Sequence, residues 1–290
     1  MSLLNETIAR IINTSGTSSL DAQALLAHFS GQSRSWVLAH PEMELKPDQQ
    51  EKLASAIQLL LSGVPLPYIL GEWEFFGLEL IISKDVLIPR PETELLVEKA
   101  LDWLISRPER RQMVDMGTGS GCIAVALAVH VRDLHVKAFD ISENALKIAR
   151  MNAEKFAVAN RMVFVLGDLW DQVDPQGNTP LTIAKEPINC AVDLITANLP
   201  YISTDTLHNL EVFGKEPDLA LDGGKDGLDV IRRFLSSAPR YLKSGGLILM
   251  EVEADHGAAS FRLAKQNFPR AEILLHQDLS GNDRLIEIKL

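Results

Sequence analysis

The chain has 290 residues, 46% of them hydrophobic, and a formal net charge of −11 at pH 7. This length suits one large domain, or a large domain with a small one beside it. The acidic balance disfavours a polyanionic partner, because a nucleic-acid-binding face normally carries an excess of basic side chains.

The N-terminal part of the chain shows helical periodicity and almost no strand pattern. Apolar stripes at helical spacing run through residues 3–12, 20–29 and 47–61. We therefore predict a small all-helical domain over residues 1–67. It contains no catalytic constellation, so it is either a stabilising appendage or a docking module for a macromolecular substrate.

The pattern changes over residues 68–90, where apolar residues alternate on both sides of Gly77. This alternation predicts a β-hairpin that links the two parts of the chain. Prolines then flank Arg90 and force residues 88–91 to be extended. A helix is expected to begin at the second of these prolines. Arg90 itself, held in a loop between prolines, is placed to face a cleft.

From residue 112 onward, strand and helix patterns alternate, which indicates an α/β doubly wound sheet within a domain over residues 91–290. The seven expected strands cover residues 112–116, 135–140, 161–166, 191–197, 246–252, 271–276 and 284–289. No long helix separates the last two strands, so we expect them to form an antiparallel pair at the edge of the sheet. Residues 171–190 are polar and predict a surface loop.

A glycine-rich stretch, Asp115-Met-Gly117-Thr-Gly119-Ser-Gly121, lies between the first of these strands and an apolar helix. Glycines let the backbone approach a ligand closely, and the start of the helix adds a partial positive charge. Asp140 ends the next strand, about 20 residues after the last glycine, where a carboxylate reaches ribose hydroxyl groups.

The rival interpretation of this stretch is a nicotinamide-binding fold, whose fingerprint is G-x-G-x-x-G. Here the spacing is G-x-G-x-G, and Asp115 would repel phosphates. S-adenosylmethionine fits better, because it carries a sulfonium and an ammonium group and no phosphate. Asp168, after the third strand, is placed to meet the adenine edge, although a turn at the end of a strand is the plainer alternative. The predicted cofactor-binding residues are Asp115, Gly117, Thr118, Gly119, Ser120, Gly121, Asp140, Asp168, Leu169 and Asn198.

The tetrapeptide Asn198-Leu199-Pro200-Tyr201 follows the buried strand over residues 191–197. Ligands of open α/β sheets sit beyond the carboxyl ends of the strands, where this tetrapeptide would lie. The amide of Asn198 can accept an N–H, Pro200 turns the chain outward, and Tyr201 offers a ring face to a flat group. By itself the tetrapeptide is also compatible with an ordinary turn. Combined with the glycine-rich stretch, it predicts a methyltransferase that acts on a planar N–H₂ group, with Asn198, Pro200 and Tyr201 as catalytic residues.

Several other classes are disfavoured. Cys122 and Cys190 have no spacing typical of a disulfide framework or a zinc site, and the seven histidines form no ligand pair, so no metal is expected. Cys122 falls in an apolar helical run, where a small buried thiol is expected. No run approaches a membrane span, and the N-terminus does not read as a signal peptide. We therefore expect a cytoplasmic protein.

Over nearly its whole length, the chain resembles the protein-(glutamine-N5) methyltransferases that modify class 1 peptide chain release factors. The resemblance includes the helical N-terminal domain and the hairpin. The motifs that carry it are Leu87-Ile-Pro-Arg-Pro-Glu-Thr-Glu94, the glycine-rich stretch, Asn198-Leu-Pro-Tyr201, Glu216-Pro-Asp-Leu-Ala-Leu-Asp-Gly-Gly224, Asp226-Gly-Leu228 and Asp278-Leu-Ser-Gly-Asn-Asp-Arg284. The tetrapeptide marks amino-group methylation in general, and the stretches from Arg90 to Glu94 and from Ala220 to Gly224 point to the glutamine branch.

The resemblance implies a seven-stranded S-adenosylmethionine-dependent, Rossmann-like domain. It also implies that the chain methylates N5 of the glutamine in the Gly-Gly-Gln loop of a release factor, as a monomer and without binding nucleic acid directly. The implied substrate-binding residues are Arg90, Glu92, Asn198, Leu199, Pro200 and Tyr201. Two departures stand out. The family usually has proline where this chain has Leu199, and Gly and Gln where it has Glu253 and His256.

Other functions remain compatible with the motifs. Adenine presents the same planar amino group, so a DNA or RNA adenine-N6 methyltransferase is one alternative, although it would need base extrusion and phosphate contacts. Glutamine methylation of a ribosomal protein is another. A catalytically silent S-adenosylmethionine-binding scaffold is a third, and the intact Asn198, Pro200 and Tyr201 argue against it.

Overall fold

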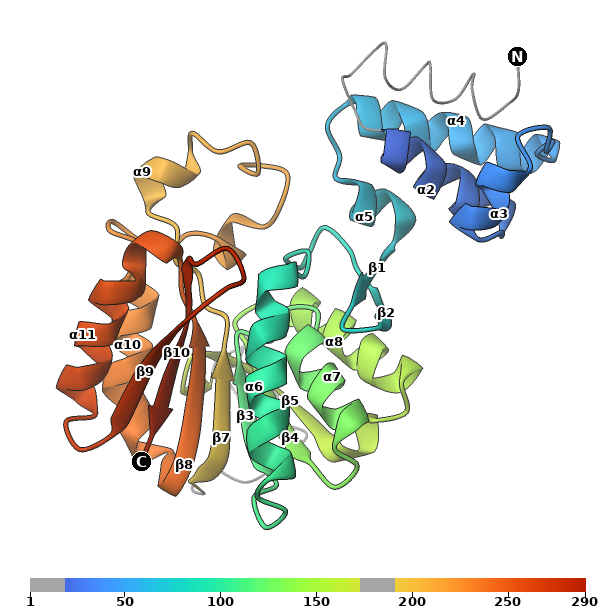
Figure 1. The fold of residues 1–290 in the computed structure, drawn as a ribbon. Helices are drawn as coiled ribbons and strands as arrows, with labels where there is room; N and C mark the ends of the chain where they lie inside the picture. The colour runs from blue at the N-terminus through green and yellow to red at the C-terminus, as the bar shows by residue number, and fades with distance from the viewer. Residues whose placement is uncertain (1–18, 173–190) are drawn as a thin grey trace. The chain divides into compact units, whose positions relative to one another are not determined.

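The computed structural model describes residues 19–172 and 191–290 (Figure 1). The chain divides into two compact units, Met1–Glu72 and Trp73–Leu290. This division falls after Glu72, whereas the sequence placed the end of the helical domain at residue 67. The predicted helix over residues 3–12 and nearly all of the predicted loop over 171–190 lie outside the described residues.

The first unit is helical in its described part. Its helices are α2 (Ser19–Ser30), α3 (Arg34–Ala39), α4 (Pro47–Leu61) and α5 (Leu66–Leu70). The two helices expected over residues 20–29 and 47–61 are confirmed as α2 and α4. Their apolar faces pack on one another through side chains such as Leu25, Leu26 and Ile57. Helix α3 was not predicted, because six residues are too few to show a helical period.

A two-stranded hairpin consists of β1 (Glu72–Phe75) and β2 (Leu78–Ile81). Its turn residues, Phe76 and Gly77, both have positive φ, at 51° and 72°. Two central residues with positive φ match the right-handed twist of the strands that they join. The hairpin is shorter than the predicted stretch, because Tyr68 belongs to α5. The carboxylate of Glu94 accepts the Phe76 N–H at 2.9 Å and so anchors the turn.

The second unit contains an eight-stranded sheet in the order β6-β5-β4-β3-β7-β8-β10-β9. The strands are β3 (Gln112–Met116), β4 (His135–Asp140), β5 (Met162–Asp168), β6 (Asp171–Gln172), β7 (Val192–Ala197), β8 (Leu242–Glu251), β9 (Glu272–Gln277) and β10 (Asp283–Lys289). The five central strands, β5, β4, β3, β7 and β8, run parallel. The α/β doubly wound fold and its seven strands are confirmed, and β9 and β10 form the expected antiparallel edge pair. The two-residue β6 is an addition at the start of the predicted loop.

The helices around this sheet alternate with its strands. They are α6 (Glu94–Ile105), α7 (Cys122–His130), α8 (Glu143–Lys155), α9 (Thr204–Leu207), α10 (Asp229–Ser237) and α11 (Gly257–Asn267). The ribbon places α6, α7 and α8 together, and α10 and α11 together near β9 and β10 (Figure 1). A 3₁₀ turn, η1 (Pro91–Thr93), leads into α6, so the helix expected after the second proline is confirmed.

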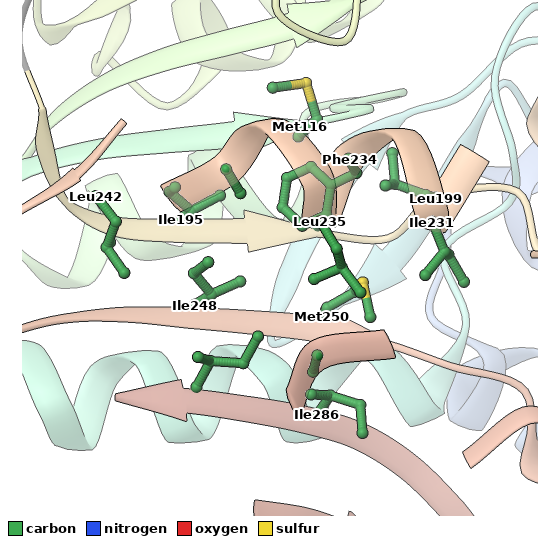
Figure 2. Packing of buried hydrophobic residues seen from close by; sticks show 14 of the residues in the cluster. Met116, Ile195, Leu199, Ile231, Phe234, Leu235, Leu242, Ile248, Met250 and Ile286 are labelled. Carbon is green, nitrogen blue, oxygen red and sulfur yellow. The ribbon is translucent and has the colours of Figure 1, made fainter. Parts of the chain in front are cut away.

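An apolar core lies where α10 covers β7, β8 and β10 (Figure 2). Phe234 of α10 and Ile195 of β7 are fully buried there. Leu199, from the tetrapeptide after β7, is 3% exposed and belongs to the same core. The residue that departs from the family pattern therefore fastens the tetrapeptide to the apolar interior.

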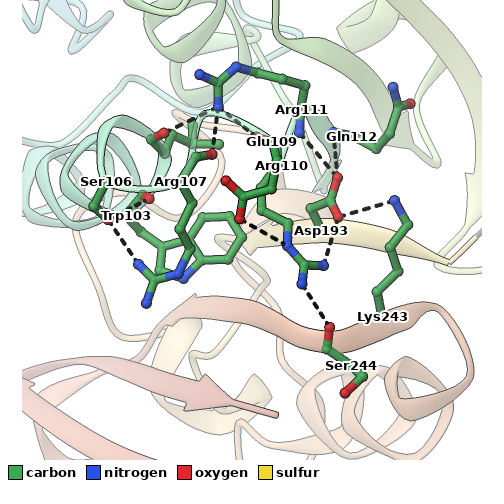
Figure 3. Close-up of polar contacts among 11 residues, drawn as sticks. Trp103, Ser106, Arg107, Glu109, Arg110, Arg111, Gln112, Asp193, Lys243 and Ser244 are labelled. Atoms are coloured by element: carbon green, nitrogen blue, oxygen red, sulfur yellow. Dashed lines mark hydrogen bonds and ion pairs between the residues drawn. The ribbon is translucent and has the colours of Figure 1, made fainter.

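A polar cluster lies at the amino-terminal ends of β3, β7 and β8 (Figure 3). Asp193 of β7 accepts the backbone N–H groups of Arg111 and Gln112 at 3.1 and 3.0 Å. The side chains of Arg110 and Lys243 approach the same carboxylate, each at 3.1 Å. Burial raises the pKa of this carboxyl, but the Gln112 N–H and the two cations outweigh burial and hold it below its usual value.

Candidate active site

A cavity of about 250 Å³ lies at the carboxyl-terminal ends of β3, β4, β5 and β7, where ligands of open α/β sheets bind. The predicted residues that line it are Arg90, Gly117, Thr118, Gly119, Ser120, Asp140, Asp168, Leu169, Asn198, Leu199 and Pro200. The predicted residues that are not part of its lining are Glu92, Asp115, Gly121 and Tyr201. The fold thus brings most of the glycine-rich stretch and most of the tetrapeptide to one cavity.

The glycine loop between β3 and α7 is held tightly against its neighbours. Gly117 and Gly121 have φ values of 71° and 79°, which side chains rarely adopt. A Cβ on Gly117 would lie 3.2 Å from the side chain of Leu199, and one on Gly121 would lie 3.1 Å from that of Ala149. Glycine at 117 therefore serves a second purpose, which is the close approach of the tetrapeptide to the loop.

Asp115 lies beneath this loop and is 1% exposed. Its two carboxylate oxygens accept the hydroxyl groups of Thr118 and Thr196, at 2.6 and 2.7 Å. Burial raises its pKa to about 6 even though both hydroxyls stabilise the charged form. In this arrangement Asp115 ties the glycine loop to β7 from below, and its contact with a ligand remains a prediction.

Asp140 ends β4 at the rim of the cavity. One carboxylate oxygen accepts the Gly119 N–H at 2.8 Å, and the other accepts the Ser142 N–H at 2.9 Å. Burial raises its pKa, and these two hydrogen bonds oppose the rise. Each carboxylate oxygen can accept more than one hydrogen bond, so Asp140 keeps acceptor capacity for ligand hydroxyl groups.

Another part of the cavity wall is formed by the last residue of β5 and the residue after it, Asp168 and Leu169. Asp168 pairs with Arg233 of α10 at 2.8 Å, and both residues line the cavity. Leu169 has a φ of 56°, which is unusual for a residue with a side chain and typical of functional sites. Asp168 therefore lines the cavity, but its carboxylate already has a cationic partner, and its contact with an adenine stays a prediction.

At the other end, the tetrapeptide is joined to residues from two distant segments. The Asn198 side-chain N–H₂ donates to the Thr93 hydroxyl at 3.3 Å, and that hydroxyl donates to Glu251 at 2.7 Å. The Tyr201 hydroxyl donates to the other oxygen of Glu251 at 3.3 Å. Burial raises the pKa of Glu251, and burial next to this carboxylate raises that of Tyr201 as well.

Two glycines that follow the tetrapeptide in the sequence, Gly223 and Gly227, have a packing role. A Cβ on Gly223 would lie 2.8 Å from the Cα of Tyr201, and one on Gly227 would collide with the Tyr201 carbonyl oxygen. The backbones of Ile202 and Gly223 are also hydrogen-bonded to each other at 2.7 Å. The segment that contains these glycines therefore packs closely against Tyr201 and fixes the path of the backbone after the tetrapeptide.

Arg90 lines the cavity as expected for a residue that faces a cleft. Its guanidinium pairs with the nearly buried Glu216 at 2.5 Å, and the same carboxylate accepts the Ile88 N–H at 3.1 Å. Arg90 thus closes the side of the cavity by joining the proline-flanked loop to the segment before η3 (Asp218–Ala220). Glu92 is exposed and does not line the cavity.

No motif or spacing in the sequence indicated a role for Thr93, Glu251 or Asn152, although all three hold the site together. Asn152 of α8 is completely buried, accepts the Ile81 N–H at 2.7 Å, and donates to the carbonyls of Ile81 and Ser120 at 2.9 Å. It therefore fastens the glycine loop to the hairpin. For Asn152, the signal available in the sequence was a polar residue on the buried face of an amphipathic helix. Cys122, expected inside a helix, starts α7 and lines the cavity, and burial raises its pKa to about 12.

The charges of the lining restrict which ligand the cavity can hold. Its two cations, Arg90 and Arg233, are both paired with acids, which partly neutralise the positive charge that a phosphate would need. Asp140 and the close-packed glycine loop suit a nucleoside with ribose hydroxyl groups. Within residues 19–172 and 191–290, no group of three or more metal-binding side chains occurs, and no helix is long and apolar enough to cross a membrane.

Family models match both parts of the chain. Residues 2–71 match the model described as PrmC N-terminal domain, and residues 91–195 match the model described as Methyltransferase small domain. The two matches follow the order of the two units.

Curated relatives match nearly the whole chain. A release factor glutamine methyltransferase of Coxiella burnetii is 36% identical over 96% of this chain and 94% of its own length. One of Bordetella pertussis is 36% identical over 98% of both chains. The solved structure described as the hMettl16 catalytic domain in complex with MAT2A 3'UTR hairpin 6 has a TM-score of 0.54. At 15% identity over 84% of this chain and 83% of that one, it supports the fold alone.

Proposed function

The chain belongs to the release factor glutamine methyltransferase family, and from this premise we propose its reaction. It transfers the methyl group of S-adenosylmethionine to N5 of the glutamine in the Gly-Gly-Gln loop of a class 1 peptide chain release factor. The observation that carries this proposal is the meeting of Asn198 and the glycine loop in one cavity. The glycine loop suits the cofactor, and Asn198 suits the planar amide of the substrate.

The lining supports S-adenosylmethionine as the cofactor. Bound there, it supplies an electrophilic methyl group on a sulfonium. The glycine loop from Gly117 to Gly121 would lie along it, Asp140 would accept its ribose hydroxyls, and the segment around Leu169 would contact its adenine. Asp115 would act from beneath, by holding Thr118 and therefore the loop in place.

The amide nitrogen of glutamine is a poor nucleophile, because its lone pair is delocalised into the carbonyl group. We propose that Asn198 Oδ1 and the backbone carbonyl of Leu199 or Pro200 accept its two N–H bonds. These acceptors orient the nitrogen and stabilise the positive charge that develops as the new N–C bond forms and the methyl–sulfur bond breaks. The electron pair of the broken bond stays on sulfur, and the nitrogen then loses a proton to solvent. Most of the rate comes from positioning at roughly 3 Å, so no strong general base is required.

Tyr201 completes the proposed substrate site. Its hydroxyl is bonded to Glu251, which restrains the ring beside Pro200, where it can pack on the substrate amide. The roles of Arg90 and Glu92 in binding the factor remain proposals. Arg90 supports the cavity wall through Glu216, whereas Glu92 is exposed and available to a partner.

The helical unit is proposed to grip the factor away from the reacting glutamine. It exposes several large apolar side chains that a partner could cover, namely Leu20, Trp36, Leu38 and Leu59. We propose that the enzyme works as a monomer in the cytoplasm, where release factors act. We also propose that it does not bind nucleic acid directly, in keeping with its net charge of −11.

The test is transfer of labelled methyl from S-adenosylmethionine to a purified class 1 release factor. A factor whose Gly-Gly-Gln glutamine is changed to Ala, a ribosomal-protein preparation and double-stranded DNA serve as parallel substrates. We expect label on the unmodified factor alone, and a loss of about 10²- to 10³-fold in rate for Asn198→Ala. Label on DNA or on ribosomal protein instead would replace the proposal with that alternative. Cofactor binding without any transfer would indicate a scaffold.

A further inference from the structure

Asn198 can serve the proposed reaction in only one of the two orientations of its side-chain amide. The substrate amide nitrogen carries two N–H donors, so it needs the acceptor, Oδ1, facing it. With the amide turned by half a rotation, Asn198 would present its own N–H₂ to the substrate N–H₂. Donor would then oppose donor, and the substrate nitrogen would be repelled.

The structure contains a device that selects the useful orientation. The Thr93 hydroxyl has a single proton, and it donates that proton to Glu251 at 2.7 Å. Its oxygen is therefore left as an acceptor, and it accepts the Asn198 N–H₂ at 3.3 Å. No donor among the described residues contacts Asn198 Oδ1, which leaves this atom for a ligand.

Glu251 sets the direction of the whole chain of hydrogen bonds. It is 3% exposed at the end of β8, and each of its carboxylate oxygens accepts one hydroxyl proton, from Thr93 and from Tyr201. In both hydrogen bonds the hydroxyl group is the donor, so Thr93 and Tyr201 each point their proton toward the carboxylate. Thr93 is 1% exposed, so water does not compete for these bonds.

We propose that Thr93 and Glu251 are positioning residues that lock the Asn198 amide with Oδ1 toward the substrate nitrogen, and that Glu251 holds Tyr201 in the same step. The inference rests on the proposed function. It assigns a purpose to a threonine within Pro91-Glu92-Thr93-Glu94 and to the glutamate that precedes the departures at Glu253 and His256.

The test compares Thr93→Val with Thr93→Ser in the full-length enzyme. Valine keeps the shape of threonine but cannot accept the Asn198 N–H₂, whereas serine keeps the hydroxyl. We expect Thr93→Val to lower kcat roughly 10- to 100-fold, because the amide is free to turn. The KM for the release factor and the Kd for S-adenosylmethionine should stay within about threefold. Thr93→Ser should recover most of the lost kcat.

Controls separate positioning from damage to the fold. Ser260→Ala removes another fully buried hydroxyl, one without a partner among the described residues, and should leave kcat unchanged. Glu251→Gln provides a second measurement if Thr93→Val does not fold. The Gln side chain has one acceptor and one donor group, so one of the two hydroxyls must reverse, and kcat should fall again.

The outcomes are distinct. A wild-type kcat in folded Thr93→Val, or in Glu251→Gln, would overturn the inference and leave the proposed function intact. Equal losses in Thr93→Val and Thr93→Ser would also overturn it, because the hydroxyl would then not be the cause. No transfer to the factor by the unmodified enzyme would instead show that the proposed function has failed.

Discussion

At the amino-terminal ends of β3 and β7, Asp193 lies between the cations Arg110 and Lys243; at the carboxyl-terminal ends of the same strands, Asp115 lies between two threonine hydroxyls. Both carboxyl groups are almost completely buried. The cations and backbone donors hold the pKa of Asp193 below its usual value, whereas burial raises that of Asp115 to about 6. Figure 3 shows the first environment, in which two cations and two backbone N–H groups contact the Asp193 carboxylate.

Asp140 and Glu251 repeat the pattern of Asp115. Burial raises the pKa of each, and among the described residues their side chains are bonded to N–H and O–H groups without an ion pair. An acid paired with cations stabilises the sheet and has no acceptor site left for a ligand. An acid held by neutral donors costs stability but retains negative charge and acceptor sites. The amino-terminal and carboxyl-terminal ends of this sheet therefore differ in the groups that bind their buried carboxylates.

The largest effect on stability is expected for Asp193→Ala. It leaves two cations and the N–H groups of Arg111 and Gln112 without their acceptor, which should lower the free energy of unfolding by about 3–5 kcal/mol. Denaturant unfolding measures this loss. The Kd for S-adenosylmethionine should not change in the remaining folded protein. A matched variant, Asp133→Ala, removes an exposed partner of Arg111 and should cost far less. A weakened cofactor affinity in Asp193→Ala would contradict the separation of the two ends.

The second prediction concerns the dependence of stability on pH. Because the pKa of Asp115 is higher in the folded state than the ordinary 3.8, the folded state binds this proton more tightly, and stability from this group falls as pH rises from about 4 to 6. At 1.36 kcal/mol per pKa unit, the fall is about 3 kcal/mol. Asp115→Asn should remove it, as seen in unfolding curves over this range.

Asp193→Asn is the control with the opposite sign. Since the folded-state pKa of Asp193 is lowered, its contribution is present above the unfolded pKa and is lost as pH falls toward the folded one. The difference between wild type and Asp193→Asn should therefore shrink below about pH 4. If the stability differences for Asp115→Asn and Asp193→Asn changed with pH in the same direction, the contrast between the two carboxyl groups would be wrong.

The smallest stability effect is expected for Gly117→Ala, at about 1–2 kcal/mol, because φ at this position is 71°. Its Cβ would also press on Leu199, so the Kd for S-adenosylmethionine should rise at least about tenfold, the reverse of the Asp193→Ala result. Calorimetry measures the affinity. Gly31→Ala, with a φ of 70° and open space around its Cβ, should carry a similar backbone cost with no change in affinity.

The order of elements in the sheet was predictable from the sequence, and the site was partly so. The strands over residues 112–116 and 135–140 were predicted to the residue. The start of β8 was missed because Gly245 and Gly246 interrupt its pattern. Helix α3 was missed because it is too short, and the hairpin was predicted too long because Tyr68 gave no sign of a helical turn.

Local motifs determined which residues reach the cavity, since the fold places the carboxyl-terminal ends of the parallel strands at the same edge. The glycine spacing and the tetrapeptide therefore specified the loop, Asp140 and Asn198 from the sequence by itself. Only the tertiary structure decided what holds them. Thr93, Asn152 and Glu251 act across separations of 105, 32 and 50 residues, and Arg90 across 126. A hydrogen bond between distant residues leaves no periodicity or spacing in the chain, because its geometry exists only after the sheet has brought the two segments together.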